Sequence, residues 1–158
     1  MGTALSIIVG QLLGAGQLEQ AVDEDRKLIA FSVVFSAAVG LVMALIAPLV
    51  PRMYNTTPLV RQLAAGMILI NAIMMPANAF TNASFFTLRS GGKSFITFLY
   101  DSVYIWILAI PVTLCLVTFT NLPVIPIYAI CYGIDIIKCV IGYILVKKRI
   151  WVNNLVAD

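Results

Sequence analysis

The sequence predicts an all-α protein, a polytopic membrane helix bundle of about four full transmembrane helices preceded by a partial one. Apolar runs separated by short charged or Pro/Asn-rich breaks fill the chain between Lys27 and Val146. Each run approaches or exceeds the roughly 20 residues that a helix needs to cross a bilayer. Hydrophobic residues make up 61% of the chain and charged residues 11%, with a mean hydropathy of +1.01. A soluble domain carries about 25% charged residues, so the composition favours a membrane protein independently.

The first expected element is a helix over residues 1–14. At about 1.5 Å of rise per residue it spans about 20 Å, roughly two-thirds of the hydrocarbon core. We therefore expect a helix whose front is cut off. Gly14 and Gly16 end it, and the charged residues 17–27 are expected to form a polar connection.

Four longer helices are expected to follow, and prolines end or interrupt three of them. They cover residues 28–50, 59–88, 95–119 and 124–146, and residues 147–158 are expected to form a cytoplasmic tail. Pro48 and Pro51 end the first, because proline cannot donate to the helical hydrogen-bond ladder. Pro76 interrupts the second and Pro111 the third. The connections are short, as between antiparallel neighbours in a bundle.

Basic residues are distributed unequally between the two ends of these helices. If the helices alternate in direction, one end carries Arg26, Lys27, Arg89, Lys93, Lys147, Lys148 and Arg149. The other end carries only Arg52 and Arg61. By the positive-inside rule, the first end and the C-terminus are cytoplasmic, and the turns around Asn55 and Asn121 are external. The sequence thus predicts a multi-pass protein of the cell (plasma) membrane, with Trp151 as an interfacial anchor.

The composition excludes several function classes. A net charge of +3 is too small for a nucleic-acid surface. The chain has no histidine, which is the commonest general base and metal ligand. Cys115, Cys131 and Cys139 lie inside apolar runs and form no CxxC pair. Without paired carboxylates or a nucleophile–base set, we expect no enzyme, no catalytic residue, no metal site and no cofactor.

Small residues recur every four positions in the segment 28–50, at Ser32, Ser36, Gly40 and Ala44. This spacing keeps them on one helix face. Small residues let neighbouring membrane helices approach closely, so the pattern predicts a packing face.

Asparagines form a stripe on the segment 59–88. Asn71, Asn78 and Asn82 follow steps that keep them on one face, and Pro76 lies within the stripe. An asparagine without a partner in hydrocarbon costs several kcal/mol on the harsher transfer scales, so the stripe must face other helices or a wet cavity. It either lines a substrate or ion pathway or acts as hydrogen-bond glue between helices.

Three ionisable residues lie at membrane depth in the last two helices. Asp101 has no cation on its own helix, and Thr97 and Tyr104 share its face. A carboxylate there is a candidate proton relay or cation ligand, and a structural role remains equally open. Asp135 is followed three residues later by Lys138, a spacing that allows a structural ion pair within one helix.

An ordered set of motifs resembles the C-terminal lobe of the multidrug and toxic compound extrusion (MATE) family. Residues 9–21, VGQLLGAGQLEQA, resemble the family's "GQ-x-x-GAG-x-x-x-x-A" junction after its eighth helix. Residues 88–93, LRSGGK, resemble the loop after the tenth helix. Asp101, Trp106 and Pro111 resemble the "D…W…P" of the eleventh. Residues 147–155, with Trp151 and Asn153-Asn154-Leu155, resemble the basic end of the twelfth.

This resemblance covers essentially the whole chain and implies a function. It implies a secondary antiporter that exports amphipathic, often cationic compounds in exchange for sodium ions or protons. Its partners would be membrane lipid, small-molecule substrates and, if the gene is split or truncated, a separate N-terminal lobe. This chain would be a C-terminal fragment. Lys93 stands where the family usually has an acidic residue, and the asparagine stripe lies where some members use a carboxylate.

Two alternatives remain. A lipid-linked oligosaccharide flippase of the same broad superfamily would share the helices, with Arg89 and Lys138 as its candidate cavity cations. The chain could also be a small membrane scaffold or accessory subunit.

Overall fold

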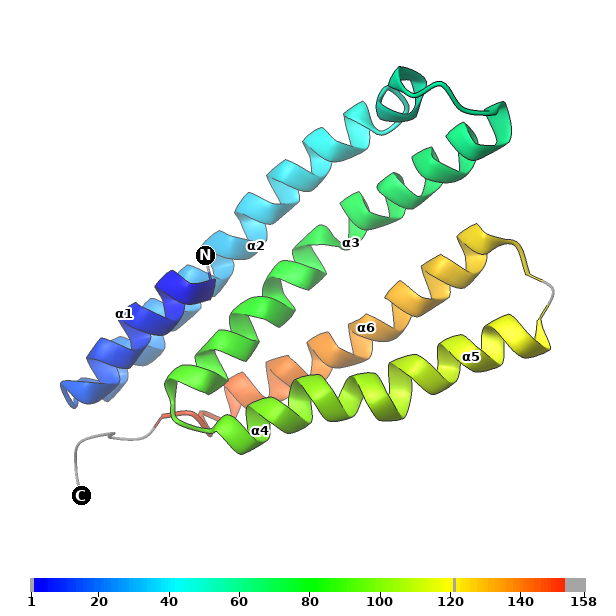
Figure 1. Cartoon of the computed structure of the whole chain (residues 1–158). Helices are drawn as coiled ribbons and strands as arrows, with labels where there is room; N and C mark the ends of the chain where they lie inside the picture. Colours follow the sequence, from blue (N-terminus) through cyan, green and yellow to red (C-terminus); the bar gives the residue numbers. More distant parts are fainter. Residues whose placement is uncertain (1, 121, 153–158) are drawn as a thin grey trace.

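The computed structural model describes residues 2–120 and 122–152 and confirms an all-α membrane bundle (Figure 1). Within those residues, four helical segments are long and apolar enough to cross a membrane, and α1 (Gly2–Gly14) is a shorter apolar helix before them. Asn121, expected in an external turn, and Asn153-Asn154-Leu155, expected in the tail, lie outside the described residues.

The first spanning helix, α2 (Leu18–Ile46), begins inside the segment that was expected to be a polar connection. The expectation of a helix starting at residue 28 missed this because residues 17–27 are highly charged. Ala21, Val22 and Asp25 are nevertheless buried at spacings of one and three residues, so they form one packed face. At the turn before α2, Gly16 has φ 75°, and the Gln17 amide donates to the Leu12 carbonyl at 2.9 Å.

A 3₁₀ turn, η1 (Val50–Met53), leads to the second spanning helix, α3 (Pro58–Ser90). The third span, Phe95–Phe119, consists of α4 (Ser94–Phe98), the π-helical pieces η2 (Leu99–Val103) and η3 (Ile105–Ala109), and α5 (Ile110–Phe119). The π-helical turns immediately precede Pro111, which has no amide hydrogen to donate and whose ring crowds the preceding turn. The fourth span is α6 (Val124–Lys147).

Helix α3 lies at the centre of the arrangement and contacts α1, α2, α4 and α6 (Figure 1). Its contact with α2 uses the predicted small-residue face. The Ser36 hydroxyl donates to the Met75 carbonyl at 2.9 Å. A Cβ added at Gly40 would lie 2.6 Å from the carbonyl oxygen of Ala72, so only glycine allows this approach.

The buried core lies at the end of the bundle that carries α1, the α3–α4 turn and the end of α6, here called the basic end. Trp151, expected as an interfacial anchor, is 1% exposed and packs in a cluster with Val9, Leu13 and Leu88. A Cβ at Gly91 would lie 2.1 Å from the Trp151 carbonyl oxygen, so the two backbones touch there. This contact brings the segment after α6 against the α3–α4 turn.

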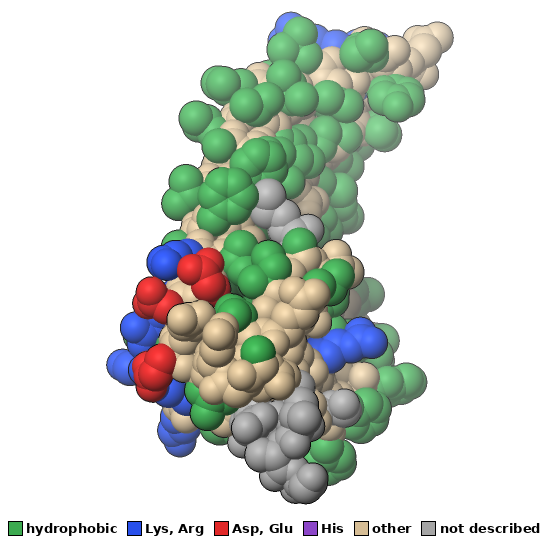
Figure 2. All heavy atoms as spheres, turned by 90° about the vertical axis from the view of Figure 1, so that its left-hand side faces the viewer, with side chains coloured by type: hydrophobic (Ala, Val, Ile, Leu, Met, Phe, Trp, Pro, Cys, Tyr) green, Lys and Arg blue, Asp and Glu red, His purple; other side chains and the backbone are tan. Residues whose placement is uncertain are grey.

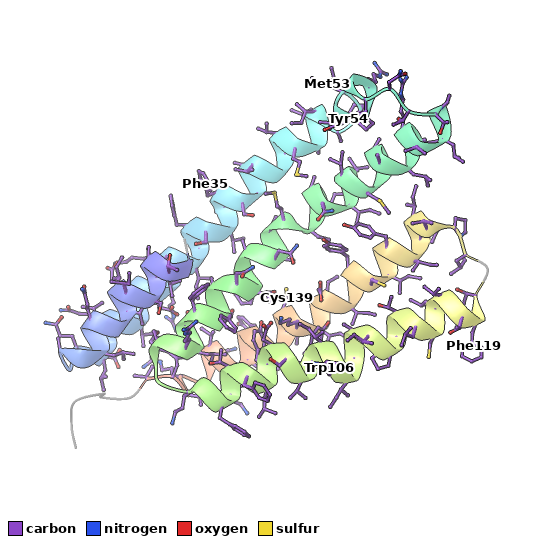
Figure 3. The ribbon with its side chains drawn as sticks, in the orientation of Figure 1. Phe35, Met53, Tyr54, Trp106, Phe119 and Cys139 are labelled. Atoms are coloured by element: carbon purple, nitrogen blue, oxygen red, sulfur yellow. The ribbon has the colours of Figure 1, made fainter. Side chains whose placement is uncertain are left out.

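Charged side chains gather at the basic end, and hydrophobic side chains cover much of the face between it and the opposite end (Figure 2). Phe35 and Trp106 point away from the bundle, with exposed fractions of 51% and 73% (Figure 3). Large apolar side chains on the outside of apolar helices fit a surface that faces lipid.

Candidate functional site

A polar cavity of about 250 Å³ lies where α3, η2 and α6 meet. It is lined by Asn78, Thr81, Asn82, Phe85, Phe86, Asp101, Asp135 and Lys138. Most of the site residues expected from the sequence therefore line one space, although they come from three segments far apart in the chain. Asn71 and Tyr104 do not line it, and each serves a different purpose.

Asp101 and Lys138 form an ion pair across the cavity. Lys138 Nζ lies 2.5 Å from Asp101 Oδ1, and the side chains are 13% and 43% exposed respectively. The sequence suggested that Lys138 would pair with Asp135 on its own helix; instead, the lysine reaches across to η2. The contact explains how a carboxylate without a cation on its own helix is tolerated at membrane depth.

Two tyrosines hold Lys138 from the side of the third span. Its Nζ lies 5.3 Å from the ring centre of Tyr100 and 5.5 Å from that of Tyr104, within range of cation–π attraction. The Tyr100 hydroxyl donates to the Lys138 carbonyl at 3.1 Å. The Tyr104 hydroxyl donates to the Ile134 carbonyl at 2.7 Å and lies 3.3 Å from Asp135 Oδ1. Tyr104 thus connects the third span to α6 and contacts the second carboxylate of the site.

The asparagine stripe divides between the two roles considered for it. Asn71 joins α3 to α6: its Nδ2 donates to the Tyr128 hydroxyl at 2.5 Å, and its Oδ1 accepts from the Tyr132 hydroxyl at 2.8 Å. This geometry favours hydrogen-bond glue at that position. Asn78 and Asn82 instead line the cavity, and the Asn82 amide donates to the Asn78 carbonyl of its own helix, at 3.0 Å.

Sequence reasoning missed Tyr128 and Tyr132. They lie four residues apart on α6, with ring centres 4.8 Å from each other. That spacing, which places two hydroxyls on one face of an otherwise apolar helix, was the available signal. Thr81 was missed as well; its Oγ1 lies 3.0 Å from Cys139 Sγ, where α3 meets α6 (Figure 3).

A second cavity of about 340 Å³ adjoins the first and is lined in part by Arg89, Thr97 and Ser102. Asp101 and Phe85 border both cavities. Thr97, which shares the helix face of Asp101, uses its hydroxyl to donate to the Lys93 carbonyl at 2.9 Å. Asp101 is therefore oriented by Lys138, and it forms a shared wall between two polar spaces.

The described residues contain no preformed metal centre. Within residues 2–120 and 122–152, no group of three or more His, Cys, Asp and Glu side chains is placed to hold a metal ion. A small cation or a proton would meet two carboxylates, Asp101 and Asp135, and one competing ammonium group, Lys138.

Comparison with known families identifies a relationship consistent with this geometry. The model of the MatE family matches residues 1–115, a stretch that includes the asparagine stripe, Asp101 and Tyr104. No curated protein and no solved structure matches the chain. The match confirms the resemblance to the MATE family; the motifs at residues 9–21, 88–93 and 101–111 lie within the matched stretch, and the motif at residues 147–155 lies beyond it. MatE proteins are transporters. With its four membrane-capable helices, this chain is a multi-pass membrane protein that belongs to the MatE family.

Proposed function

We propose that this chain takes part in secondary antiport, in which amphipathic, often cationic compounds are exported in exchange for sodium ions or protons. The observation that carries the proposal is the polar cavity, where Asp101 and Lys138 face each other among membrane helices. Ionisable groups at membrane depth are costly and mark ion or substrate pathways. The MatE match supports transport as the general activity.

In this proposal, the coupling cation and Lys138 compete for Asp101. A bound sodium ion or a proton on Asp101 removes the attraction that holds the two side chains 2.5 Å apart. Because this pair joins η2 to α6, its loss loosens one helix from the other. The hydrogen bonds from Tyr100 and Tyr104 to α6 remain, so the helices shift without separating. The cation can move this equilibrium only as far as its affinity differs between the two arrangements.

The cavity sizes indicate what each space accommodates. Drug-sized ligands occupy about 300–1,000 Å³, and the cavity at the ion pair holds about 250 Å³. It therefore suits a partly hydrated cation in this conformation. An amphipathic substrate would need the adjoining cavity as well, with Phe85 common to both as an apolar contact.

The flippase alternative loses support from the same geometry. A flippase cavity for a charged oligosaccharide lipid needs cations that are free to bind phosphate. Asp101 balances the charge of Lys138, which leaves Arg89 as the remaining candidate from the sequence. The proposed partners are accordingly an amphipathic small molecule, membrane lipid and an N-terminal lobe against which this lobe rocks.

The antiport proposal is tested on the purified chain in detergent. Tyrosine fluorescence should change on addition of sodium chloride, or on acidification, relative to potassium chloride at pH 7.5, because Tyr100 and Tyr104 surround Lys138. Asp101→Asn should abolish that change, and the exposed control Asp23→Asn should keep it. If wild type responds to neither cation, the coupling proposal fails.

Transport itself requires cells. Ethidium efflux should appear when the chain is expressed together with the N-terminal lobe of a MatE transporter, and Asp101→Asn should reduce it at equal protein abundance. Efflux that is unchanged by Asp101→Asn would exclude this carboxylate from coupling.

The proposed orientation in the plasma membrane places the basic end and the C-terminus in the cytoplasm. In a cysteine-free background, an impermeant thiol reagent should label Thr56→Cys from outside intact cells and leave Ser90→Cys unlabelled. The reverse pattern would invert the topology.

A further inference from the structure

A third cavity, of about 570 Å³, lies at the basic end between α2, α6 and Trp151, and we call it the α2–α6 pocket. Its walls include Val22, Asp25, Arg26, Ile29, Arg149 and Trp151. It shares no lining residue with the polar cavity at Asp101. The proposed antiport does not use it, so its lining needs a separate explanation.

The wall of the pocket contains a fully buried carboxylate. Asp25 is 0% exposed, and its Oδ1 accepts a hydrogen bond of 2.6 Å from the Thr87 hydroxyl. Its Oδ2 is also buried but has no hydrogen-bond partner among the described residues. A carboxylate can accept several hydrogen bonds, and leaving one buried oxygen without a donor is costly. No described residue supplies that donor, so a ligand in the pocket is a candidate to supply it.

The rim of the pocket is basic. Arg26, Lys147 and Arg149 line it, and Lys147 Nζ also lies 5.4 Å from the ring centre of Tyr143. Arg149 pairs with Glu19 at 3.2 Å, but both side chains are largely exposed, and an exposed pair holds its partners weakly. Guanidinium and ammonium groups beside an apolar pocket between membrane helices favour a phosphate group.

The remaining wall is apolar and follows α2 away from the charged end. Ile29, Ala30, Val33 and Val34 recur at helical spacing on the pocket side of α2, and Phe80 of α3 faces the same space. From Val22 to Val34 the wall extends about 18 Å along the helix, given about 1.5 Å of rise per residue. Val34 is 69% exposed, so the wall is open towards the surrounding lipid.

We propose that the α2–α6 pocket is a binding site for a phospholipid of the surrounding bilayer that carries a primary ammonium head group. The ammonium donates to Asp25 Oδ2, the phosphate accepts from Arg26 and Arg149, and an acyl chain lies along the apolar wall of α2. A choline head group has the same charge but no N–H donor. A glycerol head group has no cation for the carboxylate. The pocket thus distinguishes lipids by the donors on their head groups.

The experiment uses native mass spectrometry of the purified full chain with dioleoyl lipids that differ only in the head group. Phosphatidylethanolamine, its N-methyl and N,N-dimethyl derivatives, and phosphatidylcholine remove the N–H donors one at a time at constant charge. We expect retention to fall along this series, with about a tenfold difference between its ends, because a hydrogen bond to a charged group contributes that much.

Variants connect this selectivity to the pocket. Asp25→Asn keeps the acceptor for Thr87 but removes the charge, and it should lower phosphatidylethanolamine retention to the level of phosphatidylcholine. The matched control Asp23→Asn changes an exposed carboxylate on the same helix, paired with Lys27 at 3.4 Å, and should leave retention unchanged. If Asp25→Asn proves unstable, the head-group series on wild type still decides the question.

Several outcomes would overturn the proposal. Equal retention of ethanolamine and choline lipids by wild type would show that Asp25 does not select for an N–H donor on the head group. Preference for phosphatidylglycerol would indicate an anionic-lipid site set by the rim alone. Dimerisation of the chain without lipid retention would mean that a second copy covers this face. None of these outcomes depends on ethidium efflux or on sodium, so they are separable from failure of the antiport proposal.

Discussion

Two of the contacts that helix α3 makes, with α2 and with α6, differ in their chemistry. Against α2, the contact relies on small residues: Gly40 brings the backbones together at Ala72, and Ser36 donates to Met75. Against α6 it relies on polar side chains, among them Asn71. Apolar surface gives membrane helices no driving force to associate, so they need either close backbone approach or hydrogen bonds. The first kind of contact has little freedom, whereas the second can exchange partners around a cavity.

The largest effect is expected from adding one methyl group to the α2–α3 contact. Gly40→Ala places a Cβ 2.6 Å from a backbone oxygen, which cannot move aside, so unfolding in SDS should become easier by up to about 3 kcal/mol. Gly66→Ala is the matched control in α3. Its added Cβ would lie 2.9 Å from Cδ1 of Ile125, the flexible end of a side chain, so stability should hold or rise. Equal losses in both variants would refute the distinction.

The α3–α6 contact should respond to loss of its asparagine glue. Asn71→Leu leaves the hydroxyls of Tyr128 and Tyr132 without their amide partner, and the free energy of unfolding should fall by about 1–2 kcal/mol. Asn82→Leu is the control, because the Asn82 amide donates to a carbonyl of its own helix rather than to another helix. If Asn82→Leu destabilises the chain as much as Asn71→Leu does, the two asparagines do not have the separate roles, joining helices and lining the cavity, that the geometry indicates.

Asn78 provides the functional counterpart in the same stripe. Asn78→Leu should lower ethidium binding by the purified chain, measured by fluorescence anisotropy, with little change in unfolding. Asn71→Leu should instead ease unfolding and leave ethidium binding almost unchanged. Unchanged ethidium binding by Asn78→Leu would remove that position from the proposed substrate pathway.

These contrasts show how far the sequence alone could lead. Apolar runs of membrane length determine the number and type of helices, because the bilayer sets that length physically. The sequence did not predict the early start of α2, because burial of Asp25 depends on α3, which supplies the Thr87 hydroxyl. The sequence did not predict the partner of Lys138 either, because that partner depends on tertiary packing. The spacing to Asp135 is local, whereas Asp101 comes close to Lys138 only when η2 packs on α6. Local spacing in the sequence identified the polar residues, but tertiary packing determines which residues they contact.

A smaller effect is expected at the ion pair itself. A double-mutant cycle of Asp101→Asn and Lys138→Gln should give a coupling energy of about 1 kcal/mol, between the values typical of exposed and buried pairs, because Asp101 is 43% exposed. The parallel cycle with Asp135→Asn should give almost none. A larger coupling to Asp135 would restore the pair expected from the sequence.

The smallest effect is expected from the hydrogen bond at the α2–α3 contact. Ser36→Ala removes the donor to the Met75 carbonyl but keeps a small side chain, and interhelical hydrogen bonds in membranes contribute about 0.6 kcal/mol on average. Ser36→Leu removes the same bond and also forces α2 away from α3, so it should destabilise the chain considerably more. SDS unfolding of both variants separates the two contributions. If Ser36→Ala lowers the free energy of unfolding as much as Ser36→Leu does, the α2–α3 contact depends mainly on its hydrogen bond. The α2–α3 contact would then resemble the α3–α6 contact in its chemistry.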